Sequence, residues 1–139
     1  MSASPQNPLL GRCGCGAVRF EARAPFEVAR YCHCHRCQHR TGTSCSANAK
    51  LAVAAFAILT GADLIRAWGP AGGQPKSYCV ECGGHLFSGA QDDEHIFVRL
   101  GAIDGDPGIR PEYRQWLSSA VPWETIPDDG LPRHEEAGP

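Results

Sequence analysis

The segment from Tyr31 to Cys37, which reads Tyr-Cys-His-Cys-His-Arg-Cys, decides how the rest of the chain is interpreted. It places the thiols of Cys32, Cys34 and Cys37 within six positions of the sequence. Thiols so close together do not suit ordinary disulfides among themselves, but they can converge on a single metal ion. The segment therefore predicts a zinc site.

Four more cysteines occur in two short motifs. Cys13 and Cys15 form a C-x-C motif, and Cys79 and Cys82 form a C-x-x-C motif that is followed at once by Gly83-Gly84. Glycine adopts the positive φ angles that a sharp turn around a metal ion requires. The four thiols predict a tetrathiolate zinc site, and the alternative is that they are free cysteines in the core.

Seven of the eight cysteines thus divide into four and three. A structural zinc has four protein ligands, whereas a catalytic zinc keeps one position open for water or substrate. The division predicts one site of each kind. A small secreted disulfide scaffold is the rival interpretation, and the two-residue spacing within the C-x-C pairs disfavours it.

Composition is ordinary for one globular domain, with 139 residues of which 42% are hydrophobic and 20% charged. The formal charge is -2, and loading seven thiolates with two Zn²⁺ would bring it to about -5. No nucleic-acid partner is expected, because no long basic surface is encoded. No secretory signal and no membrane-spanning run is found, so a reducing cytoplasm is predicted.

Hydropathy patterns predict a chain rich in strands with a single short helical turn. The turn covers residues 35–41 and is ended by Gly42. In the first strand, Val18 and Phe20 should point inward, and an acidic turn is expected over residues 91–94. The strands are expected over residues 17–22, 26–31, 46–53, 55–60, 64–68, 85–88, 95–101 and 113–118, and residues 76–78 are expected to lead into the C-x-x-C turn.

Several spaced motifs occur together in one order. They are Gly-x-Cys-x-Cys-Gly-x-Val-x-Phe over residues 11–20, Cys-His-Cys-x-x-Cys with Thr41-Gly42 after it, Cys-x-x-Cys-Gly-Gly-x-Leu-Phe over 79–87, Leu100-Gly101-x-x-Asp104, and Pro122-Trp123. In this succession the chain resembles the glutathione-dependent formaldehyde-activating enzyme family, which also includes centromere protein V. The resemblance covers roughly residues 9–132.

The resemblance implies a mainly β, Mss4-like fold of antiparallel sheets around a structural zinc, with little helix. It places the zinc domain at residues 9–132. Residues 1–8 hold two prolines and no apolar period, so a flexible lead-in is expected there, and residues 133–139 are expected to form a polar tail. The resemblance also implies two zinc sites whose ligands are Cys13, Cys15, Cys79 and Cys82 for the structural ion and Cys32, Cys34 and Cys37 for the second ion.

The activity that the resemblance implies is that of a carbon-sulfur lyase, S-(hydroxymethyl)glutathione synthase. A zinc held by Cys32, Cys34 and Cys37 could activate a small-molecule thiol, and the zinc-bound thiolate would add to a small aldehyde such as formaldehyde. Arg36 and Arg40 are candidates to pair with a carboxylate of glutathione as co-substrate. The alternatives on the same scaffold are a non-catalytic zinc module that binds a protein partner, and a thiol carrier or metal buffer.

Other residues carry simpler interpretations. His33 and His35 alternate with the cysteines and are expected to lie outside the ligand set, while His85 and His95 are expected to be strand residues. Cys45 is expected to fill core space, the alternative being that it is a fourth ligand that closes the second zinc. The tryptophans Trp68, Trp116 and Trp123 are expected to pack in the core or at its rim, with one of them lining a pocket. Trp123 is expected to anchor the end of the domain.

Overall fold

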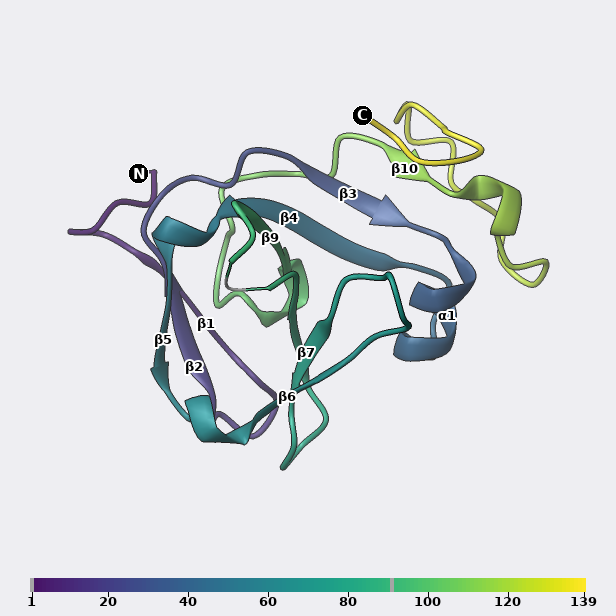
Figure 1. The fold of residues 1–139 in the computed structure, drawn as a ribbon. Helices are drawn as coiled ribbons and strands as arrows, with labels where there is room; N and C mark the ends of the chain where they lie inside the picture. The colour runs from purple at the N-terminus through teal and green to yellow at the C-terminus, as the bar shows by residue number, and fades with distance from the viewer. Residues whose placement is uncertain (1, 91) are drawn as a thin grey trace.

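The alternating segments form strands in the computed structural model, which describes residues 2–90 and 92–139 (Figure 1). Within these residues, the strands are β1 (Leu9–Arg12), β2 (Arg19–Ala22), β3 (Ala29–Cys32), β4 (Ser46–Ala52), β5 (Phe56–Thr60), β6 (Ile65–Trp68), β7 (Lys76–Cys79), β8 (His85–Ser88), β9 (His95–Arg99) and β10 (Arg114–Gln115). The helical segments are α1 (His35–Thr41) and the 3-10 turns η1 (Val53–Ala55), η2 (Ala62–Leu64), η3 (Leu100–Ala102) and η4 (Leu117–Ser119).

The described strands form two sheets. The smaller has the order β1-β2-β5, and the larger has the order β10-β3-β4-β9-β8-β7-β6. All neighbours pair antiparallel except β10, which runs parallel to β3. The predicted mainly β class, with antiparallel sheets and little helix, is confirmed.

An aromatic contact joins the two sheets at the core. The ring of Phe20 on β2 lies 5.2 Å from that of Phe56 on β5, and Phe56 lies 5.1 Å from Phe87 on β8. Val18 and Phe20 are fully buried, as their alternation with polar residues predicts. The same packing fixes the β1–β2 hairpin and the β7–β8 hairpin relative to each other.

The helical turn predicted at residues 35–41 is confirmed as α1. Cys34 is its N-cap, and the Cys34 side chain accepts a hydrogen bond from the amide of Cys37. Gly42 ends the helix at φ 71°, where its amide donates to the carbonyl of Gln38 at 2.8 Å. Figure 1 shows α1 at the end of β3, which places the helix next to the larger sheet.

The last predicted strand is shorter than expected. It covers only Arg114–Gln115, because Trp116 adopts φ 59° and η4 follows directly. The anchoring role predicted for Trp123 is wrong, since 68% of this side chain is exposed. Trp68 is also exposed and Trp116 is half-buried, so no tryptophan lies in the core.

Both ends of the chain form backbone hydrogen bonds in the described structure. Residues 133–139 run beside β10, where the amide of His134 donates to the carbonyl of Arg114 at 2.9 Å. Near the start, Ser4 and Asn7 exchange two backbone hydrogen bonds of 3.1 Å. The flexibility expected of residues 1–8 and the predicted domain limits stay predictions. Of the acidic turn predicted over 91–94, residue 91 lies outside the described residues.

Candidate metal centre and substrate cavity

The turns of two hairpins bring together four thiols, here called the four-thiol cluster: Cys13, Cys15, Cys79 and Cys82. Cys13 and Cys15 follow β1, while Cys79 ends β7 and Cys82 lies in the turn before β8. The second turn is closed by the amide of Gly83, which donates to the carbonyl of Cys79 at 2.7 Å, and Gly83 has φ 75°. The glycine thus serves the turn as the sequence predicts.

The geometry of the four-thiol cluster fits a zinc ion. Its sulfur atoms all lie within 4.8 Å of one another, and the Sγ atoms of Cys13 and Cys15 are 3.6 Å apart. Two thiolates on a tetrahedral zinc, each about 2.3 Å from the ion, would be about 3.8 Å apart. Burial opposes ionisation of Cys13, but hydrogen bonds from the Val18 amide and from neighbouring thiols lower its pKa to about 6. The cluster therefore favours thiolate ligands for a metal ion.

A second group of sulfur atoms, the three-thiol cluster, consists of Cys32, Cys34 and Cys37. Cys32 ends β3, Cys34 caps α1 and Cys37 lies in the first turn of that helix, so one strand-to-helix turn positions all three. Their Sγ atoms also lie within 4.8 Å of one another. Soft thiolate donors at this spacing fit a zinc ion with a fourth position open to another ligand.

Ionisation within the three-thiol cluster centres on Cys37. Hydrogen bonds from the thiols of Cys32 and Cys34, followed by one from Ser46, hold the pKa of Cys37 far below its usual range. The Ser46 hydroxyl lies 3.2 Å from the Cys37 sulfur. Hydrogen bonds with Cys34 and Cys37 raise the pKa of Cys32 correspondingly. The three thiols therefore titrate as a coupled group, in which Cys37 is the thiol whose ionisation is favoured.

A buried chain of hydrogen bonds supports Cys37 from the neighbouring strands. The side-chain amide nitrogen of Asn48 donates to Ser46 Oγ at 2.9 Å, and Arg99 in turn donates to the side-chain oxygen of Asn48. Arg99 also donates to the hydroxyl of Ser88. All of these polar residues are buried on β4, β8 and β9. The chain fixes the orientation of Ser46, and therefore of the hydrogen bond that stabilises the Cys37 thiolate.

The three-thiol cluster opens into a cavity of about 280 Å³, the thiol cavity. Its described lining consists of Arg30, Cys32, Cys34, Arg36, Cys37, Arg40, Asn48, Gln74, Lys76, Ser88, Phe97, Arg99 and Trp116. Five of these side chains are cationic and none is acidic. Although the whole chain has a net charge of -2, this cavity is strongly positive.

The five cations of the thiol cavity lack carboxylate partners among the described residues. Elsewhere Arg12, Arg23, Arg110 and Arg114 form ion pairs, the last with Asp129 at 2.8 Å. Within the cavity, burial, followed by the charge of Arg40, lowers the pKa of Arg99 to about 10. Arg99 is thus a buried charge without a carboxylate counter-ion in the described chain, which destabilises the free protein, and an anionic ligand would relieve that cost.

Arg30 and Arg40 are held in place by contacts other than ion pairs. The guanidinium of Arg30 lies 4.1 Å from the ring centre of Phe97. Arg40 donates to Nδ1 of His85 at 3.0 Å and to the sulfur of Cys37 at 3.7 Å. Both side chains also bury an Nε atom that has no hydrogen-bond partner among the described residues. These cations are oriented before any ligand arrives.

Trp116 is the only non-glycine residue of the described chain with a positive φ, and it lines the thiol cavity. Backbone strain of this kind costs about 1–3 kcal/mol and persists only where the surroundings impose it. Gln38 of α1 helps to impose it, because its amide donates to the carbonyls of His33 and Ser119 at 2.7 Å each. Trp116 therefore lies where α1, the three-thiol cluster and the thiol cavity meet.

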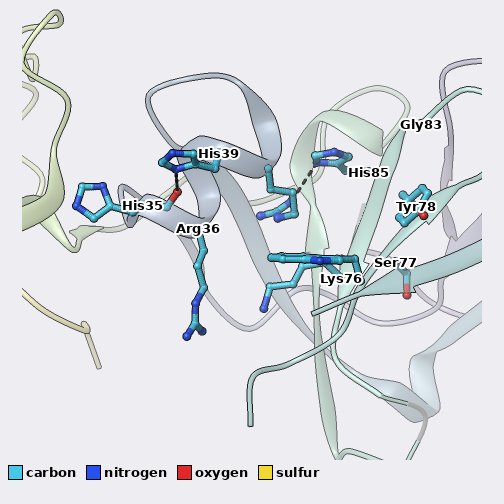
Figure 2. Close-up of a pocket in the computed structure, with 10 residues that line it drawn as sticks. His35, Arg36, His39, Lys76, Ser77, Tyr78, Gly83 and His85 are labelled. Carbon is cyan, nitrogen blue, oxygen red and sulfur yellow. Dashed lines mark hydrogen bonds between the residues drawn. The ribbon is translucent and has the colours of Figure 1, made fainter. Parts of the chain in front are cut away.

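A larger cavity of about 670 Å³, the aromatic cavity, adjoins the thiol cavity and shares Arg36, Arg40 and Lys76 with it. Figure 2 shows its two walls: His35, Arg36 and His39 come from α1, and Ser77, Tyr78, Gly83 and His85 from the β7–β8 hairpin. Trp68 completes the lining, and none of the described lining residues is acidic. The pair of cavities could hold a ligand considerably longer than an aldehyde.

His33 is buried beneath the three-thiol cluster. Its Nε2 accepts a hydrogen bond from Arg114 at 3.2 Å, and Arg114 donates to Asp129 at 2.8 Å. The imidazole lies outside the groups of converging ligand atoms, as the sequence predicts. Its contact with Arg114 fixes the loop that carries Cys32 and Cys34.

The structure also shows where the other residues singled out in the sequence lie. Arg36 and Arg40 both lie at the thiol cavity, whereas the half-buried Cys45 is not part of the three-thiol cluster. His85 and His95 begin β8 and β9, as expected of strand residues. Contributions from Arg30, Ser46, Asn48, Lys76 and Arg99 were not predicted. The sequence feature that could have revealed them is a polar side chain at a strand position whose alternation pattern points toward the core.

No helix in the described part of the chain is long and apolar enough to cross a membrane.

Comparisons with known proteins agree with the geometry. The crystal structure of a protein from Rhodobacter sphaeroides is similar with a TM-score of 0.58 and 23% identity, over 70% of this chain and 89% of that one. This similarity concerns the fold. No curated protein sequence matches the chain significantly. The family model for the glutathione-dependent formaldehyde-activating enzyme matches residues 8–119. The chain therefore belongs to the glutathione-dependent formaldehyde-activating enzyme family.

Proposed function

We propose that this protein is a zinc-dependent carbon-sulfur lyase-like enzyme that joins an anionic thiol such as glutathione to a small aldehyde, and that it also catalyses the reverse cleavage. One observation carries the proposal: the three-thiol cluster opens into a cavity whose walls hold five cations without carboxylate partners in the described chain. A structural module has no need of such a cavity, whereas an enzyme for an anionic thiol does.

The two clusters would hold two zinc ions with different roles. The four-thiol cluster would supply all four ligands of a structural ion, while Cys32, Cys34 and Cys37 would hold the second ion. Zinc at the second position would act as a Lewis acid that lowers the pKa of an incoming thiol. The reducing cytoplasm proposed for the protein would keep these cysteines available as ligands.

The residues of the chain have separate tasks in this reaction. Ser46 and Arg40 hold the charge of Cys37 through contacts of 3.2 and 3.7 Å with its sulfur. Arg36 and Lys76 line both cavities and would pair with the carboxylates of the thiol. Binding the thiol at this position gives an orientation and a local concentration that free diffusion does not provide.

The chemical balance of the proposed step is simple. The thiol loses its proton, its sulfur forms a bond with the aldehyde carbon, and the former carbonyl oxygen takes up a proton to become a hydroxyl. The reverse direction breaks the same carbon-sulfur bond and returns thiol and aldehyde. No electrons are exchanged with another molecule, so neither an oxidant nor a reductant is needed.

Exchange measurements by NMR test the proposal directly. Formaldehyde and glutathione form their adduct without a catalyst, and the zinc-loaded protein should accelerate exchange between free and adduct forms. Cys34→Ser should abolish the acceleration, because it removes one of the three thiols. Cys45→Ser should retain it, and a loss there would instead place Cys45 among the ligands. Equal exchange rates with and without the wild-type protein, loaded with both metals, would refute the proposed activity.

A further inference from the structure

We propose that His85 is a positioning residue of the proposed reaction, in which it holds the guanidinium of Arg40 on the sulfur of Cys37. This inference rests on the proposed function and gives a task to a residue that the sequence predicts to be an ordinary strand position. The same contact keeps Arg40 from turning toward the carboxylates of the thiol, which are left to Arg36 and Lys76.

Arg40 is held between two partners from different elements. Its Nη2 donates to Cys37 Sγ at 3.7 Å, and its Nη1 donates to His85 Nδ1 at 3.0 Å. The Nε atom of Arg40 is buried and has no hydrogen-bond partner among the described residues. Arg40 and Cys37 are three positions apart on α1, so they share one face of the helix. Because sulfur is a weak acceptor and its contact is longer, His85 supplies the firmer anchor for the guanidinium.

The direction of this hydrogen bond defines the state of the imidazole. A guanidinium has only donors, so Nδ1 of His85 accepts, and the neutral ring carries its proton on Nε2. Burial, followed by the charges of Arg40 and Arg99, lowers the pKa of His85. The ring is thus mainly neutral at pH 7, which leaves the lone pair of Nδ1 available to Arg40.

His85 is fixed by the β7–β8 hairpin and not by Arg40. It begins β8 and lies opposite Tyr78 of β7. The turn before it is closed by the amide of Cys79, which donates to the carbonyl of Gly84 at 3.0 Å. In Figure 2 a dashed line joins His85 to the side chain that reaches it from α1. The hairpin therefore provides a rigid support for a cation that belongs to the helix.

A cation on a ligand sulfur changes what that sulfur gives to a metal ion. A hydrogen bond from a guanidinium withdraws electron density, so Cys37 would donate less to a bound zinc and leave it a stronger Lewis acid. Without His85, Arg40 would keep only its contact with the sulfur and would be free to turn toward a substrate carboxylate. We expect the loss of His85 to slow the reaction without weakening the binding of the thiol.

Cadmium bound in place of zinc tests the contact by NMR, because the cadmium resonance depends on the number of sulfur ligands and on their hydrogen bonds. The four-thiol and three-thiol clusters should give separate resonances. His85→Gln should shift the resonance of the three-thiol cluster, since its amide lies at the place of Nε2 and offers Arg40 no acceptor at the place of Nδ1. His85→Asn is the matched control, because its side-chain oxygen takes the place of Nδ1 and should preserve the resonance. An unshifted resonance in both variants would overturn the inference.

The resonance of the four-thiol cluster reports on the hairpin itself. We expect it to stay in place in both variants of His85. If His85→Gln moves both resonances, the hairpin has shifted, and His85→Asn decides the matter. The inference stands if asparagine preserves the resonance of the three-thiol cluster, and it is wrong if asparagine moves that resonance as glutamine does.

A double substitution shows whether His85 acts through Arg40. Arg40→Met should move the resonance of the three-thiol cluster as His85→Gln does, because both remove the cation from the Cys37 sulfur. Adding His85→Gln to Arg40→Met should move it no further. A further shift in the double variant would mean that His85 acts by another route, which would contradict the inference.

Exchange and binding measurements separate this inference from the proposed function. With zinc bound, His85→Gln should slow the exchange of formaldehyde and glutathione with their adduct about tenfold. The dissociation constant of S-methylglutathione, measured by calorimetry, should stay unchanged, because the carboxylates pair with Arg36 and Lys76. Equal losses of rate and affinity would show that Arg40 acts on the substrate, and the inference would be wrong.

The two proposals can fail separately. If the cadmium resonances behave as expected but the wild type does not accelerate exchange, the positioning of Arg40 by His85 stands and the proposed function fails. If the wild type accelerates exchange and His85→Gln accelerates it equally, the inference fails and the proposed function stands.

Discussion

The two cysteine clusters use the same chemical group in different surroundings. The four-thiol cluster collects sulfur atoms from hairpin turns more than sixty positions apart in sequence, from Cys13 to Cys82. Its near neighbours are backbone amides, such as that of Val18 at 3.3 Å from the Cys13 sulfur. The three-thiol cluster lies within one turn from Cys32 to Cys37, and its neighbours are hydroxyl and guanidinium side chains.

The difference indicates which of the two clusters would contribute more to the stability of the fold by binding a metal ion. A metal ion that joins distant hairpins restricts the unfolded chain and holds the two sheets in place. An ion within one turn adds little to the fold, because the N-cap of α1 and the pairing of β3 with β4 already fix that turn. We infer that a metal ion in the four-thiol cluster would serve stability and that one in the three-thiol cluster would serve chemistry.

Removing one thiol from each cluster should give the largest contrast. Cys79→Ser is expected to lower the free energy of unfolding by more than about 3 kcal/mol, because Cys79 is fully buried and ties the two hairpins together. Cys34→Ser should cost less than about 1 kcal/mol, because serine is a preferred N-cap residue and its hydroxyl oxygen can accept the hydrogen bond from the Cys37 amide. Urea unfolding of the zinc-loaded proteins, with zinc counted by mass spectrometry, provides the measurement. Equal losses would remove the distinction between the clusters.

Two buried arginines, Arg99 and Arg114, differ in their charge partners and give the next contrast. Arg99 has no carboxylate partner in the described chain, whereas Arg114 pairs with Asp129. Arg99→Met should raise the dissociation constant of glutathione about tenfold, because one cation of the thiol cavity is lost. It should lower stability by about 1 kcal/mol, because the loss of the hydrogen bonds to Asn48 and Ser88 is partly offset by the removal of a buried charge without a carboxylate partner. Arg114→Met should lower stability by about 2 kcal/mol, because Asp129 loses its partner. Calorimetry and urea unfolding of both variants check the two effects.

The parts of the site that depend on short motifs could be predicted from the sequence. The spacing of Cys32, Cys34 and Cys37 fixes their distances once the chain turns, and Gly42 marks the end of α1. The pairing of the C-x-C motif with the C-x-x-C motif was also predictable, because the division into four and three matches zinc coordination. Local backbone constraints and metal chemistry carried these predictions.

Three of the five cations of the thiol cavity could not be predicted, because they come together only in the folded sheet. Arg30, Lys76 and Arg99 come from β3, β7 and β9, and strand order places these segments together where sequence distance does not. The anchoring role predicted for Trp123 failed for a related reason, whereas Trp68 and Trp116 do line cavities. Burial depends on which face of an element is covered, and the exposed Trp68 lies on β6, at the edge of the larger sheet.

A methyl group added at one glycine tests how tightly the four-thiol cluster is built. In Gly84→Ala the new Cβ would lie 3.0 Å from the amide nitrogen of Gly14 and 3.3 Å from the sulfur of Cys82. The hairpins must then move apart, which should cost about 1 kcal/mol and weaken zinc retention against a chelator. Gly101→Ala is the control, since its added Cβ meets nothing within 4 Å. Zinc release that is equally slow in both variants would contradict the tight packing.

Acid should give the smallest effect, through the ion pair that fixes His33. The hydrogen bond from Arg114, followed by one from the Leu131 amide, lowers the pKa of Asp129. A lowered carboxyl pKa stabilises the folded state above the unfolded value of about 3.9, and this contribution disappears as the pH falls through the folded pKa. Wild type should therefore exceed Asp129→Asn in stability near pH 7, and the difference should shrink below about pH 4. Because acid also releases metal from thiolates, the difference in unfolding free energy between the two proteins is the quantity to follow. A difference that stays constant down to pH 3 would mean that the Asp129 charge does not support Arg114, and that the three-thiol cluster is held by α1 and Gln38 alone.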